Sequence, residues 1–115
     1  MERPKRSKFM GQYFKIEYVQ KIIDHDDPSK TVYGQLDDEN SVINIENGMH
    51  HERERDTLIH ETLHQMLNKS GIRWKDDKQE EEVIEFLGSA ILSHIRDNKK
   101  FWAYVMEPPP DEGEE

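Results

Sequence analysis

Apolar residues in the second half of the chain recur at intervals of three and four residues, which predicts two amphipathic helices. The first helix spans about residues 51 to 69, with Gly71 as its stop, and its apolar stripe is Ile59, Leu63, Met66 and Leu67. The second spans about residues 78 to 98, and its apolar positions are Val83, Ile84, Leu87, Ile91 and Ile95. Because only the short segment 74–77 intervenes, we expect the two helices to pack on each other.

The first half of the chain instead shows short β-prone runs separated by polar turns. Residues 13–19 predict a strand, and the polar stretch 25–29 predicts a loop. Residues 31–36 and 41–45 predict a hairpin around a four-residue turn, after which Asn47-Gly48 ends the second strand. The sequence therefore predicts an α+β fold in which a small antiparallel or mixed sheet of about three strands packs on two helices.

The two ends of the chain differ in charge and in apolar content from the middle. Residues 1–10 are basic and residues 107–115 are acidic and proline-interrupted, so both predict flexible termini around one domain at 11–106. Near the end of that domain, Phe101, Trp102, Tyr104 and Val105 form a last apolar segment. We expect this segment to close the core, in preference to a ligand-stacking role for Trp102 or Trp74.

Composition narrows the classes of function. A chain of 115 residues accommodates one core, and a net charge of −9 argues against a general nucleic-acid or membrane surface. The absence of cysteine excludes a disulfide framework and thiolate zinc ligands. No apolar run of transmembrane length and no signal-peptide pattern are present, so we expect a cytoplasmic protein.

The segment His60-Glu61-Thr62-Leu63-His64 is an H-E-x-x-H motif on the first predicted helix. Side chains at i and i+4 project from one helix face, so His60 and His64 can share one metal ion. Zinc (Zn²⁺) accepts imidazole nitrogens and keeps a coordination position for water. Glu61 is then the catalytic candidate, a general base acting on that water.

A zinc site of this kind needs one further protein ligand. The acidic start of the second helix supplies candidates, and its helical positions rank Glu81 first, Glu85 second and Glu82 third. Glu85 is the alternative third ligand, or it hydrogen-bonds a ligating histidine from outside. His94 is a weaker candidate because it lies 13 helical residues beyond Glu81.

Three segments carry a resemblance to a known family: 41–45, 57–64 and 81–87. Together they resemble the small phage-encoded and mobile-element zincins related to the ImmA/IrrE-type metallopeptidases, over roughly residues 31 to 98. The resemblance implies a minimal zincin-like fold, a ligand at Glu81 and an apolar helix end at 90–92. Glu85 stands where the family has Asn. The extended zincin pattern, with a Gly and a third His, is absent because Leu67 and Ser70 occupy those positions.

The sequence thus predicts a gluzincin-like metallopeptidase that hydrolyses a protein or peptide substrate lying along the hairpin edge. Its oxyanion donor is left open among Tyr33, His50, His51 and Tyr104. Two other functions are weighed: a zinc-stabilised protein-binding module without proteolytic activity, and a helical adaptor with an accidental motif. An intact Glu61 favours the enzyme. The oligomeric state stays open.

Overall fold

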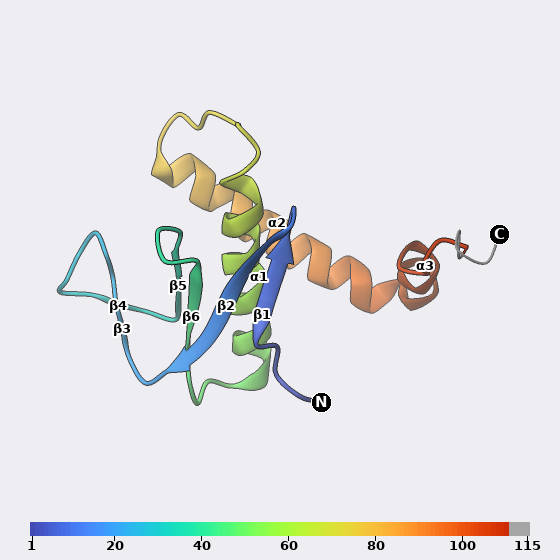
Figure 1. Cartoon of the computed structure of the whole chain (residues 1–115), viewed down its shortest axis with the longest axis horizontal. Coiled ribbons are helices and arrows are strands. Elements are labelled where there is room, and N and C mark those ends of the chain that lie inside the picture. The colour runs from blue at the N-terminus through green and yellow to red at the C-terminus, as the bar shows by residue number, and fades with distance from the viewer. Residues whose placement is uncertain (111–115) are drawn as a thin grey trace.

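The computed structural model describes residues 1–110 and has an α+β architecture of a mixed sheet and three helices (Figure 1). The strands are β1 (Arg6–Phe9), β2 (Gln12–Val19), β3 (Ile22–Ile23), β4 (Thr31–Val32), β5 (Gly34–Asp37) and β6 (Val42–Glu46). The helices are α1 (His51–Leu67), α2 (Asp77–Asp97) and α3 (Lys99–Val105).

The main sheet has four strands in the order β1-β2-β6-β5, and β3 pairs with β4 in a separate two-stranded ribbon. Strands β2 and β6 run parallel, whereas β1 and β5 pair antiparallel with their neighbours. The predicted count of about three strands is therefore wrong, because β1 was missed. This strand is short, and its charged residues Arg6 and Lys8 made it resemble a solvated end.

Strand β1 also corrects the prediction that residues 1–10 form a flexible terminus. Met10 and Gly11 both have positive φ, at 50° and 82°, so they form the tight two-residue hairpin turn that joins β1 to β2. Ser7 in β1 hydrogen-bonds the buried Gln65 of α1, and Arg3 pairs with Glu54 of the same helix. The start of the chain is therefore part of the packed domain.

The predicted hairpin is present as β5 and β6, with a shorter first strand than expected. Thr31–Val32 pairs with β3 instead of extending β5. The turn between β5 and β6 is held by Asp37, whose side chain accepts a hydrogen bond from the Asn40 backbone N–H at 3.1 Å. In the turn, this hydrogen bond takes the place of the backbone hydrogen bonds that pair the two strands.

The hydrophobic core lies between the main sheet and α1. Alternate residues of two neighbouring strands point to it, which is the period-two pattern of a sheet with one buried face. Its fully buried members are Phe14, Ile16, Ile43 and Ile45, and partly buried Tyr18, Leu36, Met49 and Leu58 pack around them. The central strands are therefore fixed in register by their apolar side chains.

Helix α1 buries polar side chains rather than the apolar stripe that its sequence suggested. Its buried residues are Glu54, Thr57, Glu61 and Gln65, and all but one of them have partners from the N-terminal segment or the helix itself. The exception is Glu61, whose side chain lies against Gly34 of β5. Among residues 1–110, no buried side-chain nitrogen or oxygen lacks a hydrogen-bond partner.

The apolar residues of α1 pack instead against α2. Ile59 and Leu63 lie beside Gly88, and Ile84 of α2 is fully buried. Helix α1 ends at Leu67, two residues before the predicted end, so Gly71 lies outside it. Helix α2 is within one residue of its predicted bounds, because the Asp76 side chain caps it by accepting a hydrogen bond from the Gln79 N–H.

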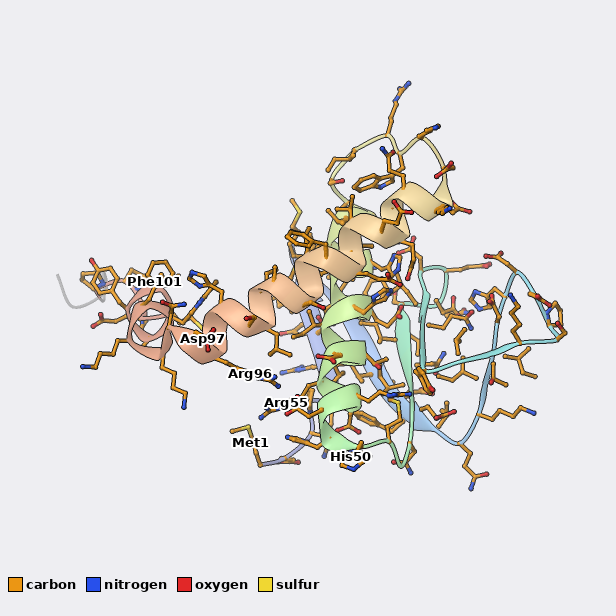
Figure 2. The ribbon with its side chains drawn as sticks, turned by 180° about the vertical axis from the view of Figure 1, so that it is seen from behind. Met1, His50, Arg55, Arg96, Asp97 and Phe101 are labelled. Carbon is orange, nitrogen blue, oxygen red and sulfur yellow. The ribbon has the colours of Figure 1, made fainter. Side chains whose placement is uncertain are left out.

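The C-terminal apolar segment does not close the core, so that prediction is wrong. It forms α3, which stands away from the sheet at the far end of α2 (Figure 1). Phe101, Tyr104 and Val105 are each more than half exposed. Figure 2 labels Phe101 and Asp97 on this arm, well apart from the strands. Trp102 packs only locally, and its indole N–H donates to His94 Nδ1 at 2.9 Å.

The predicted acidic tail, 107–115, lies only partly within the described residues. Residues 107–110 form no helix or strand, and 111–115 lie outside the described part. Within residues 1–110, no helix combines the length and the hydropathy that crossing a lipid bilayer requires.

Gly34 at the start of β5 is where the sheet meets α1 most closely. A Cβ atom placed there would lie 2.5 Å from Thr57 Cγ2 and 3.0 Å from Glu61 Cγ. Thr57 cannot easily turn away, because its hydroxyl donates to the Arg53 carbonyl oxygen at 2.7 Å. Only glycine therefore lets the β5 backbone lie directly on this part of the helix.

We predict opposite stability effects for alanine at two glycines. Gly34→Ala should lower the free energy of unfolding by about 1–3 kcal/mol, because the added methyl overpacks a fixed contact. Gly88→Ala should raise it by about 0.5–1 kcal/mol, because its Cβ would lie 3.5 Å from Ile59 Cγ2, an ordinary contact, and alanine is the better helix former. Urea unfolding followed by circular dichroism measures both, and a neutral Gly34→Ala would contradict the close approach.

Candidate metal centre

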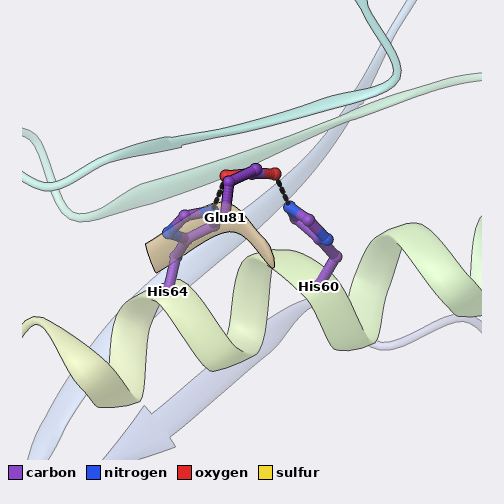
Figure 3. Close-up of side chains that lie close together, drawn as sticks. All are labelled: His60, His64 and Glu81. Carbon is purple, nitrogen blue, oxygen red and sulfur yellow. Dashed lines mark hydrogen bonds and ion pairs between the residues drawn. The ribbon is translucent and has the colours of Figure 1, made fainter. Parts of the chain in front are cut away.

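Three side chains from two helices converge on one point. His60 and His64 project from the same side of α1, and the Glu81 carboxylate reaches across from α2 between them (Figure 3). His60 Nε2 lies 2.5 Å from Glu81 Oε1, and His64 Nε2 lies 3.1 Å from Glu81 Oε2. One donor atom from each residue falls within 4.8 Å of the others, so the three could hold a single ion.

The contacts of His64 fit metal binding through one ring nitrogen. Its Nδ1 lies 3.3 Å from Glu80 Oε1, while its Nε2 faces Glu81. A neutral imidazole donates from one nitrogen and accepts with the other. With Nδ1–H donated to Glu80, Nε2 keeps its lone pair for a metal, and a carboxylate partner of this kind orients a ligating histidine.

The carboxylates around the group also change its protonation. The hydrogen bond that His60 donates to the Glu81 carboxylate raises the pKa of His60 against the opposing effect of burial. Burial lowers the pKa of His64, but its hydrogen bond with Glu81 and the nearby Glu61 outweigh this, and the pKa is raised overall. Hydrogen bonds from the two imidazoles hold the pKa of Glu81 well below its usual range. The carboxylates thus favour a positive charge at this point, which either a proton on the histidines or a bound metal ion can supply.

The other proposed third ligands lie outside this group. Glu82 and Glu85 are exposed on α2, and the potential metal-binding group found within residues 1–110 includes neither. His94 sits near the far end of α2 with Trp102. The structure thus gives Glu81 the position that was ranked first. Glu85 was also considered as a hydrogen-bond partner of a ligating histidine. In the structure it is Glu80 that lies beside His64.

Glu61 lies under strand β5 beside the two histidines and is 6% exposed. Burial raises the pKa of its carboxyl group, and the nearby His64 and His60 partly oppose the change. Glu61 does not belong to the ligand group. It is therefore a buried carboxylate next to a potential metal site without being one of its ligands.

Two hollows open beside these residues, and both are lined by His60, Glu61, Glu81 and Gly34. The first, which we call the Arg53 hollow, measures about 330 Å³ and also includes Tyr33, Arg53, Asp56 and Thr57. The second, the Asp77 hollow, measures about 440 Å³, and its charged lining includes Asp24, Asp26, Asp77 and Glu80. Together they form an open cleft with the candidate metal group at its middle.

Of the four oxyanion candidates, Tyr33 alone lines either hollow within the described chain. His50 and His51 are exposed at the start of α1, and Tyr104 is 78% exposed on α3. Sequence reasoning missed three residues at the cleft, namely His25, Arg53 and Glu80. His25 comes from a loop that no periodic pattern places. Arg53 could have been found, because it precedes His60 by two helical turns.

Comparison of the chain with protein-family models, curated proteins and solved structures gives no match.

We predict that substitutions of the glutamates of α2 affect metal affinity to different extents. His60→Ala, His64→Ala and Glu81→Ala should each lose most of the bound metal, because each removes one of three protein donors. Glu80→Gln should weaken metal affinity about 10- to 100-fold through the orientation of His64. Glu85→Gln, one turn from Glu81 and exposed, is the matched control. Competition with a chromogenic chelator measures all five, and weakened binding in Glu85→Gln alone would overturn the assignment.

We also predict opposite pH responses for the metal-free and metal-loaded protein. A raised histidine pKa stabilises the metal-free fold below the ordinary value of 6.5, and this contribution is lost as the pH rises through the raised values. A metal must displace the same protons, so its affinity should increase as the pH rises from about 6 to about 8. Thermal melts with zinc and with chelator would measure both trends, and parallel trends would contradict the linkage.

Proposed function

We propose that the chain is a zinc-dependent, gluzincin-like metallopeptidase that hydrolyses peptide bonds of a protein substrate. The observation that carries this proposal is the placement of the buried Glu61 beside a group of two histidines and a glutamate that could hold a metal. A metal-binding group alone would serve structure as well as chemistry. A neighbouring buried carboxylate outside the ligand set adds the base that hydrolysis needs.

The donor set supports zinc as the metal. Two imidazole nitrogens and one carboxylate oxygen suit zinc, and three protein ligands leave the open position that is typical of a catalytic site. When bound, zinc supplies a Lewis acid that lowers the pKa of water and polarises the scissile carbonyl. His60, His64 and Glu81 would hold it, and Glu80 would keep His64 in the ligating tautomer.

Glu61 would transfer the proton from the attacking water to the leaving group. Its carboxylate accepts a proton from the attacking water as the water oxygen bonds to the carbonyl carbon, and then delivers that proton to the leaving amine nitrogen when the C–N bond breaks. Burial raises its pKa, which makes the carboxylate a stronger base than an exposed glutamate. Its side chain lies below β5, against Gly34.

The free edge of β5 offers a binding place for an extended peptide. The bond from Glu46 N–H to the Tyr33 carbonyl sets the antiparallel ladder with β6, so Gly34 and Leu36 direct their backbone groups away from β6. These outward groups, including those of Gly34 beside Glu61, would pair with the substrate by strand addition.

The same arrangement supports the zincin-like interpretation of the fold and the resemblance to ImmA/IrrE-type metallopeptidases. A motif helix lies against a sheet edge, and a second helix returns a glutamate to the first. The rival function, a zinc-stabilised binding module, needs the ligands but has no use for a buried base.

We predict that Glu61→Gln keeps the metal and loses hydrolysis. Glutamine has nearly the same shape and Glu61 is not in the ligand group, so metal content should be unchanged, while loss of the base should lower kcat at least about a hundredfold. Mass spectrometry of a proteome-derived peptide library would detect cleavage, and elemental analysis would measure the metal. Glu85→Gln is the control with full activity. An inactive zinc-loaded wild type would favour the binding module.

A further inference from the structure

The cleft beside the candidate metal group is unequally charged. Its Asp77 hollow is lined by six carboxylates, from the β3–β4 loop, α1 and α2, and two of them, Glu61 and Glu81, also line the Arg53 hollow. Its Arg53 hollow contains Arg53, the one lysine or arginine that lines either hollow within residues 1–110. In a chain of net charge −9, a cation at this position is unlike its surroundings.

Arg53 is held at the hollow by an aromatic partner rather than by a carboxylate. Its Nη1 donates to the Tyr33 hydroxyl oxygen at 2.5 Å, and its Cζ lies 4.6 Å from the Tyr33 ring centroid. No carboxylate within the described residues lies within ion-pair distance of it. A guanidinium has five N–H donors in a planar fork, so most of them remain for a ligand.

Asp56 lines the same hollow and lies three residues from Arg53 on α1. A helical pair at this spacing is weak even when it forms. Asp56 therefore competes weakly for the guanidinium.

We propose that Arg53, positioned by Tyr33, binds a carboxylate of the substrate residue that follows the scissile bond. This inference rests on the proposed peptidase function. The carboxylate is either an Asp or Glu side chain or the C-terminal carboxylate of a short peptide, since both fit the guanidinium fork.

The direction of β5 decides the side of the scissile bond. Gly34, at the start of β5, lies on Thr57, and Tyr33 just before it contacts Arg53. The start of β5 therefore points to the Arg53 end of the cleft. Antiparallel pairing is the more stable form of strand addition, and an antiparallel substrate would place its C-terminal side at this end. The leaving-group residue thus meets Arg53.

Peptide cleavage tests this specificity directly. Zinc-loaded wild type is incubated with two proteome-derived peptide libraries, one with free C-termini and one amidated, and the cleaved bonds are identified by mass spectrometry. We expect Asp or Glu after the scissile bond, or cleavage just before a free C-terminal residue, to be favoured about tenfold or more. Arg53→Gln should remove the preference and Asp56→Asn should strengthen it. Loss of the preference on amidation alone would identify the C-terminal carboxylate.

Arg55→Gln is the matched control, because Arg55 is exposed two residues away on α1 and lines neither hollow (Figure 2). Cleavage without an Arg53-dependent acidic preference, or with that preference before the scissile bond, would overturn the inference while leaving the peptidase function intact.

A binding measurement distinguishes failure of the Arg53 subsite from failure of the proposed hydrolysis. Immobilised, zinc-loaded Glu61→Gln is exposed to the same libraries, and the retained peptides are compared with those retained by Glu61→Gln combined with Arg53→Gln. Arg53-dependent retention of acidic or free-carboxylate peptides supports the subsite even if wild type cleaves nothing, in which case hydrolysis alone has failed. Equal retention by the two proteins would overturn the subsite.

Discussion

The close contact between the β5 backbone and helix α1 is the constraint on which the candidate site depends. Gly34 lets β5 approach Thr57 and Glu61 without a side chain in between. This contact buries the carboxylate, raises its pKa and keeps the outer edge of β5 beside it. Because Gly34 has no side chain, the candidate base Glu61 and the candidate peptide-binding edge of β5 lie next to each other.

The opposite wall of the site depends on how α2 packs. Ile59, Leu63 and Ile84 bury the apolar contact between the two helices, and Gly88 lies beside Ile59 and Leu63. This contact sets the position of α2 so that Glu81 reaches both histidines and Glu80 reaches His64 from the other side. Apolar packing thus provides the rigidity, while the first turns of α2 provide the charge. The same carboxylates that favour a cation also raise the proton affinity of the histidines.

The sequence predicted those parts of the fold that depend on local periodicity. Both long helices, the β5–β6 hairpin and the ranking of Glu81 follow from spacing within one element or from short connections. The strand β1 and the exposed α3 were misassigned, because burial there depends on distant partners: Gln65 hydrogen-bonds Ser7, whereas Phe101 stays more than half exposed. The predicted packing of the two long helices on each other is confirmed. Periodicity gave no indication that Glu54, Thr57 and Gln65, on the other side of α1, are buried and bond the chain around them.

The charge distribution of the cleft adds a constraint on any substrate of the proposed enzyme. Glu61, Glu81 and the carboxylates of the Asp77 hollow would repel an acidic peptide, and a bound divalent cation would offset only part of that charge. Arg53 is positioned on the side away from most of these carboxylates. A substrate with an acidic leaving-group side and a neutral or basic preceding side would match both halves of the cleft. The same polarity would disfavour binding in the reverse direction, so charge and strand pairing select one orientation of the peptide.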